Sequence, residues 1–335
     1  MPLPPPYIAN TDKNWFDFLT SIAALDAGGR RTIPEANFWF PNAQSPHVKA
    51  LSAGTPVFFR LKKPNYAVAG VGFFAAYHML TIDDAWGAFG VGNGDASYGQ
   101  FARRILSYRT GRKTVANESE SDHFELDRPL ACMILRGVEF WAQDKWIPWG
   151  EAQGFAAPIV TGKFENDAMR AARLEASIGS VGEIRAAEFA GAFRLVDADG
   201  RRWREQSAQA VREGQSSFRL RLLDVYGSQC AITGEHTLPV LDAAHIQPYL
   251  GRASNHIQNG IVLTKEFHTL FDKGYVTVTP DLRVRISERL KRDFSNGRRY
   301  YPYDGQPLAK LPDDAVAHPS RDALDWHARH VFRAG

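Results

Sequence analysis

The chain has 335 residues, of which 44% are hydrophobic and 23% are charged, and its formal net charge is +3. These values predict a folded protein of two domains and exclude a disordered chain. The longest charge-free apolar run, residues 67–80, is too short to span a bilayer. The first residues lack the basic start and apolar core of a signal peptide. We therefore expect a cytoplasmic protein.

Aromatic and charged residues are distributed unevenly along the chain. Six of the eight tryptophans lie in the first 150 residues. Residues 201–335 carry 20 Lys+Arg against 15 Asp+Glu, a net charge of +5, whereas the first 200 residues carry 20 against 22, a net charge of −2. The basic second part suggests a polyanionic partner. The two cysteines, Cys132 and Cys230, are far apart in the sequence, so neither a disulfide framework nor a CxxC zinc site is expected.

The first part of the chain is predicted to be rich in β-structure. Apolar spacing and a Gly28-Gly29 stop predict a helix over residues 12–27. Short apolar runs between turn residues predict strands at 38–40, 56–61, 66–74 and 131–141, with a short helix at 82–89 and a loop at 109–122. We place the first domain at residues 1–165.

The composition changes after this domain. Residues 166–212 are rich in alanine and charge and are interpreted as a helical linker. Residues 213–335 form the second predicted domain, which opens with a helix at 218–227 and continues with two short strands, a loop and another helix. The expected fold class is therefore α+β.

Four residues of the second domain have a spacing that suits phosphodiester hydrolysis. His245 ends an apolar run, Asn259 begins the next one, and His268 and Asp272 follow four residues apart. On a helix, this last pair lies on one side and can hold a divalent ion. Such an ion neutralises charge on the phosphate, and a histidine that titrates near neutral pH is a suitable general base. Asn259 is expected to tie down the loop that orients His245.

These residues resemble the HNH endonucleases of the ββα-metal fold. The resemblance covers residues 215–335 and is carried by His245 in DAAHI, Asn259 in NGIVL, and His268 with Asp272 in FHTLFDKG. In CAITG, Thr233 stands where many members have the second cysteine of a zinc site, so the chain is similar to a zinc-free branch of predicted restriction endonucleases. The resemblance implies a DNA endonuclease that uses a divalent metal ion, Mg²⁺ or Mn²⁺, without structural zinc.

One position departs from this family pattern. Members often have a metal-binding Asp or His directly before the base, and here that residue is Ala244. Asp242, two residues earlier, is the candidate replacement ligand, although it can equally be a strand-end carboxylate. Asp272 has its own alternative role as a helix-end cap.

Basic residues of the second domain are candidates for contacts with the DNA backbone. Their alternative role is a solvated charged surface. They are Arg252, Arg283, Arg285, Lys291 and Arg292.

The segment FWFPNAQSPHVKALSAGTPVFFRLKKPNYAVAGVGFFAAY resembles a diverged barrel of the PUA superfamily, which includes EVE, SRA and YTH modules. The resemblance implies a pocket that accepts a flipped base between aromatic rings. Candidate walls are Trp39, Tyr66 and Trp86, and their alternative role is in the core. Asn93 or Asp95 are candidates for reading the base edge, and Arg60, Lys62 and Lys63 for contacting phosphates.

Together, the two domains predict a modification-dependent restriction enzyme that cuts DNA carrying 5-methylcytosine or 5-hydroxymethylcytosine. A single site of this type cuts one strand, so a homodimer is expected. Two alternatives remain open. The first is a restriction nuclease that reads unmodified sequence, and the second is a catalytically inactive nucleic-acid-binding protein, which Ala244 would favour.

Overall fold

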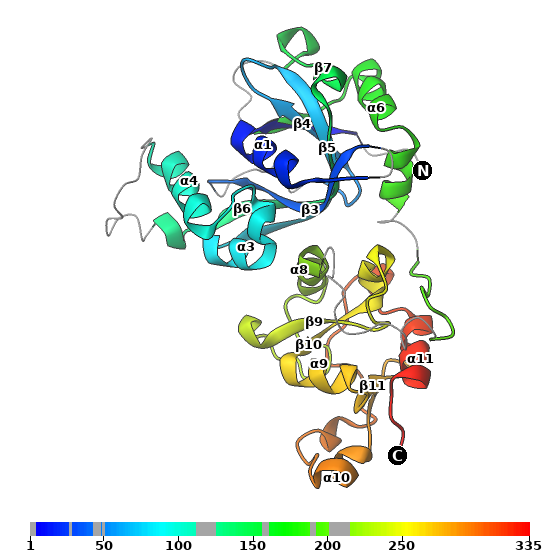
Figure 1. Cartoon of the computed structure of the whole chain (residues 1–335). Helices are drawn as coiled ribbons and strands as arrows, with labels where there is room; N and C mark the ends of the chain where they lie inside the picture. The colour runs from blue at the N-terminus through cyan, green and yellow to red at the C-terminus, as the bar shows by residue number, and fades with distance from the viewer. Residues whose placement is uncertain are drawn as a thin grey trace. The chain divides into compact units, whose positions relative to one another are not determined.

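The computed structural model describes residues 5–26, 29–42, 48, 51–111, 125–155, 161–187, 192–200 and 215–335. The chain divides into two compact units, residues 1–190 and residues 191–335. Both helices and strands are present in each unit (Figure 1), so the expected α+β class is confirmed. No helix within the described residues is long and apolar enough to cross a membrane.

The N-terminal unit is built on one large sheet. Its strands follow the order β2-β3-β6-β5-β4-β1-β8, with β7 added at β5. The pairs are antiparallel except for β1 and β4, which run parallel. Its elements are β1 (Tyr7–Thr11), α1 (Lys13–Ile22), β2 (Ala24–Leu25), β3 (Arg31–Phe40), β4 (Pro56–Leu61), β5 (Ala67–Leu80), α3 (Ile82–Phe89), η1 (Gly90–Asn93), α4 (Tyr98–Thr110), β6 (Leu130–Phe140), η2 (Gln143–Lys145), β7 (Ile147–Pro148), η3 (Glu151–Gln153), β8 (Gly162–Phe164) and α6 (Ala168–Ala187).

This sheet confirms the β-rich character expected for the first domain. The predicted strands at 56–61, 66–74 and 131–141 correspond to β4, β5 and β6, and the helix at 82–89 is α3. The loop expected at 109–122 lies mostly outside the described residues, and α4 extends to Thr110 at its start. Membership of the PUA superfamily stays a prediction.

The C-terminal unit contains a β-hairpin followed directly by a helix. Strands β9 and β10 pair antiparallel, and α9 begins at the residue after β10. The elements are α8 (Gln215–Val225), η4 (Leu238–Val240), β9 (Leu241–His245), η5 (Arg252–Asn255), η6 (Ile257–Asn259), β10 (Gly260–Thr264), α9 (Lys265–Asp272), β11 (Val276–Val278), β12 (Val284–Ile286), α10 (Arg289–Phe294), η7 (Tyr301–Tyr303), η8 (Ala315–Ala317) and α11 (Arg321–His330). This ββα order is the one that the sequence predicts.

The segment expected to be a linker is divided between the two units. Helix α6 belongs to the N-terminal unit, where Leu174 and Ile178 are buried in the same core cluster as Phe58 and Trp149. Phe193 is buried in the core of the C-terminal unit. Residues 201–212 lie outside the described ranges. The two apolar residues of α6 are four apart, which places them on one face of the helix and explains why it packs.

Candidate functional sites

The hairpin and helix of the C-terminal unit bring together residues that are far apart in the sequence. His245 is the last residue of β9 and pairs with Gly260 of β10. Helix α9 buries Phe267 and Phe271 in the core, so the neighbouring row with His268 and Asp272 lies on another face. A cleft of about 180 Å³ is lined by His245, Ile246, Pro248, Tyr249, His268, Asp272, His327 and Val331. The cleft therefore collects three of the four residues that the sequence singled out.

The imidazole of His245 is held on several sides. Only 7% of the residue is exposed. Its ring is stacked on Phe218 of α8, with 4.0 Å between ring centroids and 8° between planes. Its Nε2 lies 2.9 Å from Oδ1 of Asn255. The sequence pattern predicts neither of these contacts.

Gly260 allows helix α8 to come this close. A Cβ at this position would lie 2.3 Å from Leu222 Cδ1 and 2.7 Å from Phe218 Cζ. Any larger residue would therefore displace Phe218 from its stacking position beside His245.

Asn259 ties together the loop that follows His245. The residue is fully buried, and its Oδ1 accepts a hydrogen bond from the backbone N–H of Gln247 at 2.8 Å. Its Nδ2 donates to the carbonyl oxygens of Gln247 and Ser254, each at 2.9 Å. Both ends of the loop are thus bonded to one side chain, which is the kind of role that the sequence predicts for Asn259.

His268 lies between two carboxylates. Its Nδ1 is 2.9 Å from Oδ2 of Asp242 on β9, and its Nε2 is 3.4 Å from Oδ2 of Asp272, one helical turn later. Partial burial alone would raise the pKa of the Asp242 carboxyl. The hydrogen bond and charge of His268, helped by the Ala243 N–H and by Arg219, instead lower this pKa below its ordinary value. Asp242 is therefore an anion at neutral pH.

Ala244 and Cys230, which the sequence singles out near this site, both lie in the interior of the unit. Ala244 is fully buried and pairs with Ile261, and Cys230 is a buried free thiol in the same unit. Among the described residues, no three or more His, Cys, Asp or Glu side chains form a cluster with metal-site geometry. A metal held here would thus depend on two side chains together with water and substrate oxygens.

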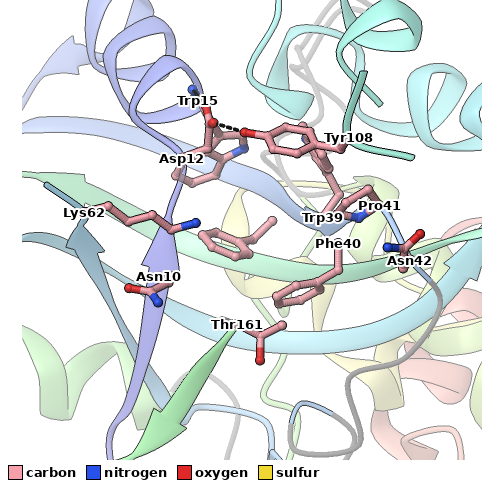
Figure 2. Close-up of a pocket in the computed structure, with 11 residues that line it drawn as sticks. Asn10, Asp12, Trp15, Trp39, Phe40, Pro41, Asn42, Lys62, Tyr108 and Thr161 are labelled. Carbon is pink, nitrogen blue, oxygen red and sulfur yellow. Dashed lines mark hydrogen bonds between the residues drawn. The ribbon is translucent and has the colours of Figure 1, made fainter. Parts of the chain in front are cut away.

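The N-terminal unit contains a pocket of about 330 Å³ with aromatic walls. It is lined by Asn10, Asp12, Trp15, Phe38, Trp39, Phe40, Pro41, Asn42, Lys62, Tyr108 and Thr161. Figure 2 shows Lys62 reaching in from the side opposite Trp39 and Asn42. Its walls combine aromatic faces with several polar side chains, a combination that suits a small-molecule site.

Asp12 is engaged at the edge of this pocket. Its carboxylate caps helix α1 by accepting from the Trp15 N–H at 2.9 Å, and it also accepts from the hydroxyl of Tyr108 (Figure 2) and from Arg104. Burial and then the bond to Asp12 raise the pKa of Tyr108 far above its ordinary value, so the phenol keeps its hydrogen. The polar groups of Lys62, Asn42 and Thr161 are better candidates for ligand contacts.

The structure brings only one of the three predicted pocket aromatics into this pocket. Trp39 lines it, with its indole N–H donating to the Asn93 carbonyl at 2.8 Å. Tyr66 is 46% exposed and lies under Arg60, and Trp86 packs on Tyr98 and Phe101, so neither lines the pocket. A sequence pattern does not separate pocket aromatics from those that pack elsewhere.

The residues proposed to read a base edge have other partners. Asn93 is fully buried, and its amide bonds to Asn37 and to the Ala85 and Gly90 carbonyls. Asp95 forms an ion pair with Arg104. Both therefore stabilise the turn after α3.

The predicted phosphate-contacting residues of the N-terminal unit differ in their exposure to solvent. Arg60 is 5% exposed and donates to the Trp149 carbonyl and to Asn10 Oδ1, each at 2.7 Å, so it is a structural residue. Lys62 and Lys63 are exposed.

The predicted phosphate contacts of the second domain lie around β12 and α10. Arg283, Arg285 and Arg292 are more than half exposed and sit near Asp281, Asp304 and Asp293, and Lys291 is exposed. Within this unit, Figure 1 shows α10 at the end away from β9 and α9. The backbone of Arg252 lies in η5, and its side chain is outside the described part of the chain.

Comparison with known proteins identifies the hairpin and helix. Residues 230–279 match the family model described as HNH endonuclease. The C-terminal unit therefore carries an HNH endonuclease domain, the kind of domain that cleaves DNA phosphodiester bonds.

Two solved structures are similar to longer parts of the chain, whereas no curated protein matches it. The first is a ZmASCH mutant protein from Zymomonas mobilis, with 10% identity, a TM-score of 0.30, and coverage of 51% of this chain and 96% of that chain. The second is described as modification dependent TagI restriction endonuclease, with 14% identity, a TM-score of 0.24, and coverage of 89% and 76%.

Proposed function

We propose that this chain is a metal-dependent restriction endonuclease that cuts DNA containing a modified cytosine. The observation that carries the nuclease part is the cleft shared by His245, His268 and Asp272. The aromatic pocket of the N-terminal unit supports the reading part.

His245 is the proposed general base. It takes a proton from the water that attacks the scissile phosphate, a task that suits an imidazole because its ordinary pKa lies near neutral pH. The Asn259 bonds keep the loop after β9 in one conformation, so the direction of the ring is set before DNA binds.

His268 and Asp272 are the proposed ligands of a divalent ion, with Mg²⁺ or Mn²⁺ preferred. Two ligands on adjacent positions of Mg²⁺, each about 2.1 Å from the ion, lie about 3 Å apart. The 3.4 Å between His268 Nε2 and Asp272 Oδ2 is close to this separation. The ion would neutralise charge on the phosphate and on the departing 3′ oxygen.

Asp242 has a different proposed role from the one that the sequence suggested. A histidine binds an ion through one nitrogen, and Asp242 lies at the other nitrogen of His268. We therefore propose that Asp242 orients His268 and increases its basicity, as carboxylates behind metal-binding histidines do.

The pocket around Trp39 is the proposed binding site for a base taken out of the duplex. Aromatic walls offer stacking, and the polar side chains offer hydrogen bonds to the base edge. Together these contacts offset the few kcal/mol that base flipping costs. The substrate would be 5-methylcytosine or 5-hydroxymethylcytosine in double-stranded DNA. The basic residues of the C-terminal unit are proposed to contact DNA phosphates. They are Arg252, Arg283, Arg285, Lys291 and Arg292.

A homodimer is the proposed working form on duplex DNA. The cleft offers one base and one ion site, which suffice for one strand. Analytical sedimentation with and without specific DNA measures the oligomeric state. A protein that cuts both strands while it remains a monomer on the DNA would contradict the proposed homodimer.

A cleavage assay tests the proposal. Plasmids with unmodified cytosine, 5-methylcytosine or 5-hydroxymethylcytosine are incubated with Mg²⁺ or Mn²⁺. We expect cleavage of a modified plasmid and a loss of about 10²–10⁴-fold in rate for His245→Ala, the usual contribution of a general base. His256→Ala is the matched control, because this histidine belongs to the same loop and does not line the cleft. No cleavage of any plasmid, or full activity of His245→Ala, would rule out the catalytic assignment.

The reading part is tested separately with Trp39→Ala and Lys62→Ala. We expect weaker preference for modified DNA, with Lys63→Ala as the control for Lys62, since Lys63 is exposed and does not line the pocket. Equal cleavage of all plasmids by the wild type would instead favour a nuclease that reads unmodified sequence.

A further inference from the structure

The stacking contact of His245 leaves one property of its ring open. Stacking on Phe218 sets the plane of the imidazole. The two neutral tautomers have the same ring shape, so packing alone does not choose which nitrogen carries hydrogen. A hydrogen bond at a ring nitrogen makes this choice.

Asn255 supplies such a bond from inside the protein. Its Oδ1 is 2.9 Å from His245 Nε2, and only 1% of Asn255 is exposed. A carboxamide oxygen accepts hydrogen bonds and never donates them. Nε2 therefore carries the hydrogen in this arrangement, and the lone pair of the neutral ring is on Nδ1.

The position of Asn255 depends on the residues that hold its loop. The preceding residue, Ser254, accepts at its Oγ from the Leu250 N–H at 2.9 Å, and its carbonyl accepts from Asn259 Nδ2. Asn259 also binds Gln247 at the start of the loop. A chain of contacts thus runs from Asn259 through Ser254 to Asn255 and the ring of His245.

We infer that Asn255 is a positioning residue that holds His245 as the tautomer with hydrogen on Nε2, so that Nδ1 is the basic nitrogen. This inference rests on the proposed role of His245. In the reaction, Nδ1 takes a proton from water, the water oxygen bonds to phosphorus, and the bond from phosphorus to the 3′ oxygen breaks. The departing 3′ oxygen keeps the electron pair of that bond and takes a proton from solvent water. The ring becomes a cation with hydrogen on both nitrogens. The acceptor at Nε2 then stabilises a charge that is absent in the ground state.

Two substitutions separate this role from simple packing. Asn255→Leu removes the acceptor at similar size, and we expect kcat to fall about 10- to 100-fold, as for other residues that orient a functional imidazole, with KM unchanged. Asn255→Asp keeps an acceptor, and we expect it to retain activity with the acidic limb of its pH–rate profile moved to higher pH, because a carboxylate favours the imidazolium. Gln258→Leu is the control, since this amide in the same loop bonds to Phe193 and Val316.

Several results would overturn the inference. Wild-type kcat in a folded Asn255→Leu variant is one. Another is Asn255→Asp as slow as Asn255→Leu, which would mean that the amide N–H is needed. If Asn255→Leu does not fold, the test uses Asn255→Asp only. Its kcat and the shift of the acidic limb of its pH–rate profile then support or contradict the inference. The same assay includes His245→Ala. Full activity of His245→Ala would show that the proposed catalytic role of His245 is wrong, which is a different outcome from a wrong role for Asn255.

The tautomer is also measured without catalysis. Ring ¹⁵N chemical shifts of His245 in the full chain are expected to report hydrogen on Nε2. A ring with hydrogen on Nδ1 alone would contradict the inference whatever the kinetics.

Discussion

At the scale of single residues, two histidines of one cleft have different environments. His327 is 2% exposed and lies flat on Phe271, with 3.7 Å between ring centroids. Its nitrogens contact the Thr277 hydroxyl at 2.8 Å and the Phe271 carbonyl at 3.2 Å. Burial lowers the pKa of His327 to about 3, although the bond to the carbonyl opposes this. His327 is therefore neutral near pH 7 and supports α9, whereas His245 is the candidate base.

This burial predicts a loss of stability in acid. The unfolded chain takes up a proton at His327 near pH 6.5, whereas the folded chain takes it up only near pH 3. The free energy of unfolding should thus fall as pH drops through 6.5 and onward, by up to about 1.4 kcal/mol per pH unit from this group. Urea unfolding at pH 7.5 and pH 5 measures it. His327→Gln should lose less stability than wild type over this interval, whereas exposed His236→Gln should behave as wild type. Parallel pH curves for His327→Gln and wild type would contradict the assignment.

Sequence spacing predicted which residues meet in the cleft, because a strand, a loop, a strand and a helix of fixed length leave little freedom for His245, His268 and Asp272. Phe218 and Asn255 escaped prediction for a physical reason. A phenylalanine on a helix and an asparagine in a loop are common, and no spacing rule marks them as neighbours of a histidine. The order SNH at 254–256, close before Asn259, is the weak signal that was available.

At the scale of elements, strands were predicted better than helix packing. Short continuous apolar runs between turn residues predict β4, β5 and β6, since such runs fit strands that are buried on both faces. Alanine and charged residues dominate the sequence of helix α6, and this composition predicts a linker. Leu174 is fully buried and Ile178 is 6% exposed, so one apolar pair suffices to dock this helix on the N-terminal unit.

The packing of α6 is tested by a pair of substitutions on this helix. Leu174→Ala should destabilise the N-terminal unit by about 2–5 kcal/mol, the usual effect of removing a buried leucine side chain. Met169→Ala should change stability by less than about 0.5 kcal/mol, because Met169 is 85% exposed. Denaturant unfolding provides both values. Equal effects of the two changes would show that α6 does not pack as described.

At the scale of the whole molecule, the described residues of each unit include a buried hydrophobic cluster and a candidate site of their own. The proposed reading and cutting steps thus use separate sets of residues. Changes at Trp39 should alter which DNA is cut and leave metal binding intact, whereas changes at Asp272 should reduce metal binding. Calorimetric titration of Mn²⁺ into Trp39→Ala and Asp272→Ala compares them, and equal affinity in both variants would contradict the metal assignment.

The two cysteines allow the opening of each unit to be measured separately. Each unit has one of them, and both Cys132 and Cys230 are fully buried free thiols. Burial also raises the pKa of Cys132 to about 12, although the bond from Asn37 opposes this, so the thiol does not react until its unit opens. Under mild denaturant, the labelling rate of each thiol therefore reports the opening of its own unit. A bound ion stabilises only the unit that holds it, so Mn²⁺ should slow the alkylation of Cys230 and leave that of Cys132 unchanged, as peptide mass spectrometry would show.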